Sequence, residues 1–210
     1  MARPWASPSG NLYASLLLID PAPVSVSPQL GFVAGVALAD AVASIIGPGR
    51  ALLKWPNDLL IAGAKLAGLL IEATTLPDGR FVCAIGFGVN CASHPDNTPY
   101  PATSLADHVE ELSAAVLFSE LSDSFAYWLG VWSRGGNFTA IRQAWLARAH
   151  PAGTNLRVSA QDRIRGGKFK TIDEQGRLVL DCADGVITFD AGDVFPVAGA
   201  ENNQSPEQNP

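Results

Sequence analysis

The sequence predicts an α+β fold, a mixed or antiparallel sheet with packed helices followed by a small β-barrel, and two patterns indicate it. A long stretch rich in small apolar residues, 27–46, precedes several strand-like stretches that are separated by turn residues. Further along, about forty residues contain five short apolar stretches, which favours a separate all-β unit. The chain has 210 residues, of which 48% are hydrophobic, so it can form one main core and a small second one.

The first half of the chain predicts a strand, a helix and then a meander of strands. Residues 11–19 predict a strand, which Asp-Pro-Ala-Pro ends. Ser27 is expected to cap a helix that has Pro28 at its first position and runs to about Ile46. Its small residues would let this helix lie close against a sheet. Turn residues then separate the predicted strands 52–55, 59–61, 65–74 and 81–89.

The second half predicts two helices and then short strands. Apolar residues recur at helical spacing in 116–133 and 138–149, and their aromatic residues are expected to be core. We expect a catalytic domain over 1–150, a small SH3-like β domain over 153–197, and a disordered polar tail over 198–210. The strands of the small domain are predicted at 156–158, 164–172, 178–182, 186–189 and 194–197.

Charge and composition narrow the classes of protein. The formal net charge is -6, which does not favour a nucleic-acid partner. The three cysteines, at 83, 91 and 182, are odd in number and lack Cys-x-x-Cys spacing, which predicts free thiols in a cytoplasmic protein. No uninterrupted apolar run reaches the roughly 18–20 residues of a membrane span, and no signal peptide is recognisable, so no membrane association is expected.

The segment 54–68 carries the strongest chemical signal. It holds Lys54 and Lys65 near Asp58, between apolar runs. Charged side chains resist burial unless they are paired or bind a ligand, so a compact cationic cluster with an acid beside it suits an anionic ligand such as a carboxylate or a phosphate. The same residues also fit an ordinary β-hairpin with a Pro-Asn-Asp turn and solvated lysines.

Four motifs in order resemble the biotin protein ligase family. Lys-Trp-Pro-Asn-Asp at 54–58 and Lys-Leu-Ala-Gly at 65–68 together are similar to the signature of these enzymes. Trp-Ala-Ser-Pro-Ser-Gly-Asn-Leu-Tyr at 5–13 precedes them, and Gly-Phe-Gly-Val-Asn at 86–90 and Ala-Thr-Ser-Leu at 102–105 follow. The resemblance is dense from residue 3 to 105 and diffuse beyond. It implies the ligase catalytic fold, followed by an SH3-like domain.

The resemblance implies a two-step reaction with ATP, Mg²⁺ and biotin. Biotin would be activated to biotinyl-AMP and transferred to a lysine of the biotin carboxyl carrier domain of a carboxylase. It assigns Lys65 to the biotin carboxylate and the α-phosphate, and Asp58 either to Mg²⁺ or to positioning the attacking amine. It places Trp5 over the adenine and the backbone of Gly68 close to biotin. Further candidates for ligand binding are Arg3, Lys54, Asn57, Gly88 and Asn90.

Each of these assignments has a plainer alternative in the sequence. Asp58 could be a turn-stabilising side chain, Lys54 could face solvent, and Trp5 could belong to the core. A glycine such as Gly68 inside an apolar strand usually marks a bulge.

The chain departs from the family pattern at its start. A Ser-Thr-Asn segment and an arginine-rich loop normally precede the first motif, whereas only Arg3 could remain from that loop. Two alternatives follow: the start of the gene is misplaced and the natural protein is longer and active, or the chain as given is the real product and binds its ligands weakly or not at all. We therefore expect an N-terminally truncated ligase without a repressor domain, and weak or undetectable ligase activity for the chain as given. A lipoate or octanoyl ligase and an inactive binding module are the alternatives. The resemblance leaves a homodimer open.

Overall fold

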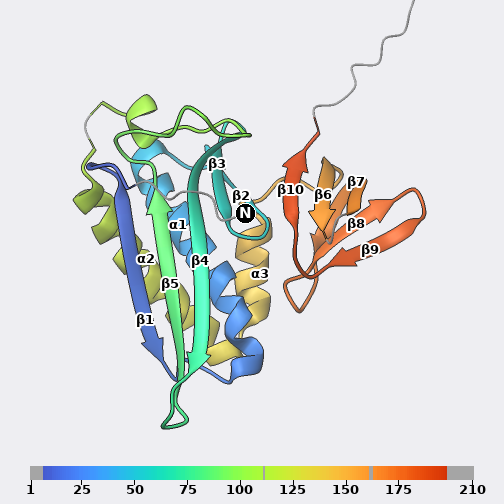
Figure 1. Ribbon diagram of the computed structural model, residues 1–210, viewed down its shortest axis with the longest axis horizontal. Helices are drawn as coiled ribbons and strands as arrows, with labels where there is room; N and C mark the ends of the chain where they lie inside the picture. The colour runs from blue at the N-terminus through green and yellow to red at the C-terminus, as the bar shows by residue number, and fades with distance from the viewer. Residues whose placement is uncertain (1–6, 111, 161–162, 198–210) are drawn as a thin grey trace, which may run out of the picture.

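A five-stranded antiparallel sheet forms the centre of the N-terminal body. The computed structural model describes residues 7–110, 112–160 and 163–197 (Figure 1). Every pair of neighbouring strands in the sheet is antiparallel, as the predicted meander requires. In order across the sheet, the strands are β1 (Leu12–Ile19), β5 (Phe81–Val89), β4 (Ala64–Thr75), β3 (Asp58–Ile61) and β2 (Ala51–Lys54).

Among the described residues, helices cover one face of this sheet and none lies on the other face, which is called the open face below (Figure 1). They are α1 (Leu30–Ile46), α2 (Ala114–Trp132) and α3 (Phe138–Leu146). The helix α1 lies close to the sheet at Gly35, where an added Cβ would come within 3.3 Å of Leu53. The core prediction for the aromatic residues of α2 and α3 is confirmed for Phe125, Trp132 and Trp145, which are buried. Trp128 is half-buried against the core, whereas Phe118 and Tyr127 on α2 are exposed.

The first helix begins differently from the prediction. A 3₁₀ helix, η1 (Val24–Gln29), precedes α1 and contains Pro28. The hydroxyl of Ser27 donates a hydrogen bond to the carbonyl of Val24 at 2.8 Å, so Ser27 does not cap α1. The predicted cap at Ser27 is wrong because the chain already turns at Val24, and the serine stabilises that earlier turn. The predicted end near Ile46 is confirmed, with Gly47 following at φ 91°.

The helical stretch Val24–Ile46 is long and apolar enough to cross a membrane by length and composition, although the sequence contains no such uninterrupted run. Within the protein, 67% of its most apolar window is buried. The burial explains the apolar composition, because α1 packs against the sheet on one side and against α2 on another.

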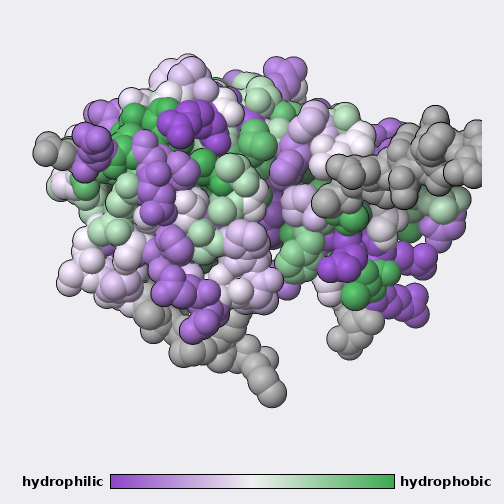
Figure 2. All heavy atoms as spheres, turned by 90° about the horizontal axis from the view of Figure 1, so that it is seen from above, coloured by the Kyte–Doolittle hydropathy of each residue, from purple (hydrophilic) through white to green (hydrophobic). Residues whose placement is uncertain are grey.

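A second five-stranded antiparallel sheet forms the C-terminal body, which is the SH3-like β domain. Figure 2 shows the two bodies side by side from above, with hydrophilic residues spread over both. The α+β prediction is therefore confirmed, while the domain limits at 150 and 153 stay predictions. The tail 198–210 lies outside the described residues. In order across the sheet, the strands are β10 (Asp193–Pro196), β6 (Asn155–Ala160), β7 (Arg163–Ile172), β8 (Leu178–Cys182) and β9 (Gly185–Phe189).

Hydrogen bonds join the two bodies. The indole of Trp55 donates to the carbonyl of Gly176 at 3.0 Å in a buried contact. Arg142 on α3 donates to the carbonyl of Ile172 at 2.6 Å and to the hydroxyl of Thr171 at 2.9 Å. These bonds fix the C-terminal sheet beside the end of β2, next to the lysine and aspartate motif.

Candidate functional site

The register of the N-terminal sheet places several predicted site residues in one row. Lys54 pairs with Asp58, Asp58 with Gly68, and Gly68 with Gly88. Directly paired residues in neighbouring strands project to the same face of a sheet. The row therefore crosses β2, β3, β4 and β5 as one continuous line, and it continues to Tyr13 on β1.

Asp58 lies between two lysines. Its Oδ2 is 2.8 Å from Nζ of Lys54, and its Oδ1 is 2.5 Å from Nζ of Lys65. The side chain of Asp58 is only 10% exposed, compared with 14% for Lys54 and 27% for Lys65. Two ammonium groups thus share one buried carboxylate, and the cluster carries one positive charge in excess. The solvent-facing alternative for Lys54 is wrong.

Gly68 gives Lys65 room to reach Asp58. A Cβ at position 68 would lie 3.3 Å from Nζ of Lys65 and 3.7 Å from Oδ1 of Asp58. Any side chain there would crowd the ammonium group against its partner. A register shift between Leu59 and Leu60 lets Lys65 pair with Leu60, so the bulge expected from the plainer alternative lies near the glycine but does not include it.

The C-terminal body supplies two contacts that the sequence did not predict. Nζ of Lys54 donates to the carbonyl of Val194 at 3.0 Å and lies 5.6 Å from the ring centre of Phe195. Sequence patterns give no signal for these contacts, since 140 residues separate Lys54 from Val194. A second aromatic ring, that of Tyr100, lies 5.4 Å from Nζ of Lys65. Tyr100 belongs to the loop that follows the Gly-Phe-Gly-Val-Asn motif.

The two predicted asparagines hold main chain in this structure. Nδ2 of Asn57 donates to the carbonyl of Leu69 at 2.7 Å, which ties the turn to β4. Nδ2 of Asn90 donates to the carbonyl of Thr103 at 3.0 Å. Both asparagines thereby shape the neighbourhood of Lys65, and their direct contact with a ligand stays a prediction. Arg3 and Trp5 lie outside the described residues.

The described part of the chain has no group of three or more His, Cys, Asp or Glu side chains that could hold a metal ion. Both oxygens of Asp58 face ammonium groups, which repel a divalent cation. The residues present therefore do not fit a resident Mg²⁺ site at Asp58. The three cysteines are free, and burial raises the pKa of the Cys83 and Cys91 thiols.

Comparison with known proteins identifies the family. Residues 2–90 match the model of the biotin/lipoate A/B protein ligase family, and residues 155–195 match the biotin protein ligase C terminal domain. A "Biotin--[acetyl-CoA-carboxylase] ligase" of Paracoccus denitrificans is 34% identical over 201 residues, covering 92% of this chain and 83% of that protein. The chain belongs to the biotin protein ligase family.

Longer ligases and a solved structure extend the comparison. The "Bifunctional ligase/repressor BirA" of Bacillus subtilis is 31% identical to this chain over 92% of its length, and the chain spans 61% of that protein. The biotin protein ligase of Aquifex aeolicus, solved in complex with biotin and ATP, has a TM-score of 0.78. It is 21% identical, with 93% of this chain and 82% of that chain covered, so it supports the fold.

Proposed function

We propose that this protein is a biotin–protein ligase that forms biotinyl-AMP from biotin and ATP and transfers biotin to a lysine of a carboxylase carrier domain. The main support for this proposal is the cluster of Lys54, Asp58 and Lys65, which has an excess positive charge on the open face of the sheet. The family relatives, which are named for the same reaction, support the proposal.

The first step brings two anions together. The carboxylate of biotin attacks the α-phosphorus of ATP, and pyrophosphate leaves. Lys65 is suited to bridge the carboxylate and the phosphate, because its side chain is more exposed than that of Lys54. Asp58 orients that ammonium group, and Lys54 supplies the second cation that keeps the aspartate from cancelling Lys65 completely.

Mg²⁺ enters this scheme as part of the nucleotide substrate. Phosphate oxygens hold the ion when ATP binds, and it offsets their charge there. The two lysines around Asp58 support a positioning role for this carboxylate and not metal ligation. In the second step the amine of the carrier lysine attacks the mixed anhydride, and AMP leaves. Each oxygen of Asp58 meets one lysine and has a further lone pair, so Asp58 can also accept a hydrogen bond from that amine.

Exchange of labelled pyrophosphate into ATP tests the first step directly. We expect exchange that depends on biotin but is weak, in line with the low activity expected for the chain as given, and only slow labelling of a purified carrier domain that avidin detects. Exchange that depends on lipoate but not on biotin would replace the proposal with the lipoate alternative. An absence of exchange with either acid, while both bind weakly in isothermal titration, would favour the inactive binding module.

Three finer points belong to the proposal. The carrier is expected to be the biotin carboxyl carrier domain of acetyl-CoA carboxylase, as the names of the relatives suggest. A homodimer and a cytoplasmic location stay predictions, which sedimentation of the purified protein and cell fractionation test. The absence of a nucleic-acid partner also stays a prediction from the net charge of -6.

A further inference from the structure

The main chain of Lys65 is held by a segment far along the sequence. The amide of Lys65 donates to the carbonyl of Pro101 at 2.8 Å, and the amide of Thr103 donates to the carbonyl of Lys65 at 3.0 Å. These two bonds form a parallel bridge between Lys65 and Ala102. The position of Lys65 therefore depends on whatever fixes residues 101–103.

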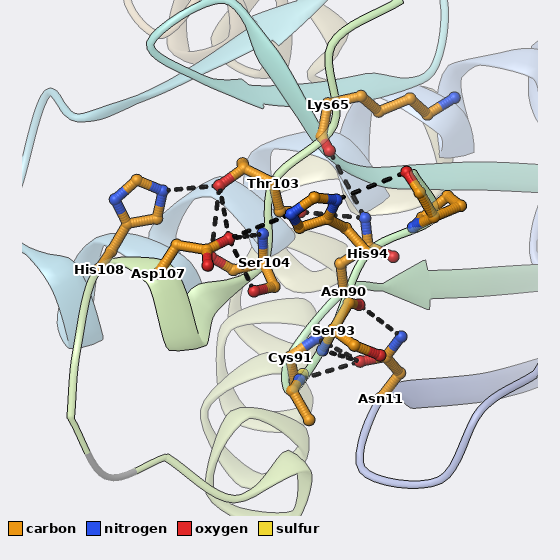
Figure 3. Close-up of polar contacts among 12 residues, drawn as sticks. Asn11, Lys65, Asn90, Cys91, Ser93, His94, Thr103, Ser104, Asp107 and His108 are labelled. Carbon is orange, nitrogen blue, oxygen red and sulfur yellow. Dashed lines mark hydrogen bonds and ion pairs between the residues drawn. The ribbon is translucent and has the colours of Figure 1, made fainter. Parts of the chain in front are cut away.

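Asp107 fixes that segment. Its Oδ2 accepts hydrogen bonds from the amide of Ser104 at 2.8 Å, the hydroxyl of Ser104 at 2.8 Å and the hydroxyl of Thr103 at 3.1 Å (Figure 3). Thr103 and Ser104 are 7% and 2% exposed. The bonds from the Ser104 amide and hydroxyl lower the pKa of Asp107, so the carboxylate is charged in the folded protein.

Two histidines extend the network (Figure 3). Nε2 of His108 lies 3.0 Å from the hydroxyl of Thr103, and Nε2 of His94 lies 3.7 Å from Oδ2 of Asp107. A threonine hydroxyl has one proton, so Thr103 accepts from His108 when it donates to Asp107. Thr103 thus has a hydrogen-bond partner on each side of its hydroxyl.

The same unit is bonded to the end of β5. The amides of Leu105 and Ala106 donate to the carbonyls of Asn90 and Cys91, both at 2.9 Å. The 3₁₀ helix η2 (Leu105–Asp107) is therefore docked on the Gly-Phe-Gly-Val-Asn strand while Thr103 is docked on Lys65. Main-chain hydrogen bonds fix the 3₁₀ helix on the strand. The side chains of Thr103, Ser104 and Asp107 then join this helix to the segment that is bonded to Lys65, so they stabilise the Lys65 bridge.

We propose that Asp107 and Thr103 are positioning residues for Lys65, which hold its ammonium group in the orientation that the adenylation step requires. This inference rests on the proposed function of Lys65. Within the described residues, neither side chain forms a hydrogen bond or ion pair with the side chain of Lys65, so each acts through the bridge at Ala102. A displacement of about 1 Å in such a group can lower a rate roughly 100-fold.

The test compares Thr103→Val with Thr103→Ser. Valine keeps the shape of threonine and removes the hydroxyl, so the biotin-dependent pyrophosphate exchange should fall about 10- to 100-fold in kcat with little change in KM for biotin. Serine keeps the hydroxyl and should restore most of the rate. Thr154→Val is the matched control, because it removes a hydroxyl that donates to the Pro151 carbonyl in the C-terminal body at 2.7 Å.

Coupling to Lys65 separates positioning from a general loss of structure. In a Lys65→Arg background, Thr103→Val should lower the exchange rate much less than it does in the natural protein, since the ammonium group to be positioned is gone. Equal effects in the two backgrounds would overturn the proposal. Asp107→Asn, which removes the charge, should behave as Thr103→Val does.

Amide hydrogen exchange gives a readout that does not need activity. Thr103→Val and Asp107→Asn should speed exchange at the amides of Lys65 and Thr103, whereas Thr154→Val should not. Unchanged protection at Lys65 would overturn the positioning role even if the protein were inactive. A lack of biotin-dependent turnover in the natural protein would overturn the proposed function instead, so the two failures are distinguishable.

Discussion

Two charged clusters in the N-terminal body differ in their balance of charge. In the cluster of Asp40 and Arg148, one carboxylate meets one guanidinium at 2.7 Å, and the indole of Trp128 donates to the other carboxylate oxygen at 2.8 Å. Arg148 also donates to the carbonyl of Ala144 at 2.8 Å. In the other cluster, Asp58 is shared by two lysines.

The difference separates a structural cluster from a binding one. The cluster of Asp40 and Arg148 is neutral and its carboxylate oxygens are both occupied, so it joins α1 to α2 and to the chain after α3. In the Asp58 cluster both carboxylate oxygens are also bonded, but two lysines face one aspartate, so the cluster has a net positive charge. An anionic ligand can neutralise that excess on the open face of the sheet, which is the property that adenylation needs.

Removing the excess charge should have the largest effect. Lys65→Met leaves Lys54 and Asp58 as a balanced pair, like Asp40 and Arg148, and the fold should be kept. We expect the biotin-dependent pyrophosphate exchange to fall at least 100-fold, because a preorganised charge at the reacting groups is lost. Lys170→Met, at an exposed position of β7, is the control. A Lys65→Met protein with undiminished exchange would contradict the role of the cluster.

The second-largest effect is expected when the carboxylate of each cluster is removed, because the two clusters should then respond differently. Asp58→Asn leaves two ammonium groups together, so it should lower both the exchange rate and the free energy of unfolding, the latter by about 1–3 kcal/mol. Asp40→Asn should lower the free energy of unfolding by less, about 0.5–1 kcal/mol, and leave exchange unchanged. Chemical denaturation and the exchange assay measure both quantities. Loss of activity in Asp40→Asn would mean that the comparison is mistaken.

The smallest expected effect is on a neighbouring histidine. His150 follows α3, its buried Nε2 has no hydrogen-bond partner, and its pKa is lowered from 6.5 by burial and then by the positive charge of Lys54. The unfolded chain therefore binds a proton at higher pH, and stability falls as the pH drops below about 6.5. Lys54→Met should raise the pKa of His150 partway in an NMR titration, whereas Lys170→Met should not. If Lys54→Met left the pKa of His150 unchanged, the positive charge of Lys54 would not act on His150.

Much of the fold was predictable because local patterns agree with the tertiary structure. The strands Phe81–Val89 and Leu178–Cys182 have the predicted limits, since turn residues bound both of them. The small residues of α1 correctly predicted that this helix packs closely against the sheet. The start of α1 was not predictable. A serine hydroxyl can cap the helix that follows it or bond to the turn before it, and in the structure the hydroxyl of Ser27 bonds to the carbonyl of Val24 in the earlier turn.

The residues of the site were predictable from the sequence, but the long-range contacts that hold them in place were not. The motifs named Lys54, Asp58, Lys65 and Gly68. The register aligns Lys54, Asp58 and Gly68, and an ion pair with Asp58 adds Lys65. The contact of Lys54 with Val194 and the hold of Asp107 on residues 101–103 have no local signal, since they join segments that are distant in the sequence.

The sequence by itself determined the order of helices and strands and the residue types of a cationic site, because periodicity, turns and short motifs are local properties. Only the tertiary structure decided that one carboxylate serves two lysines and that a distant 3₁₀ helix holds one of them in place. Those arrangements depend on strand register and on long-range main-chain hydrogen bonds, which form only when segments far apart in the chain pack together.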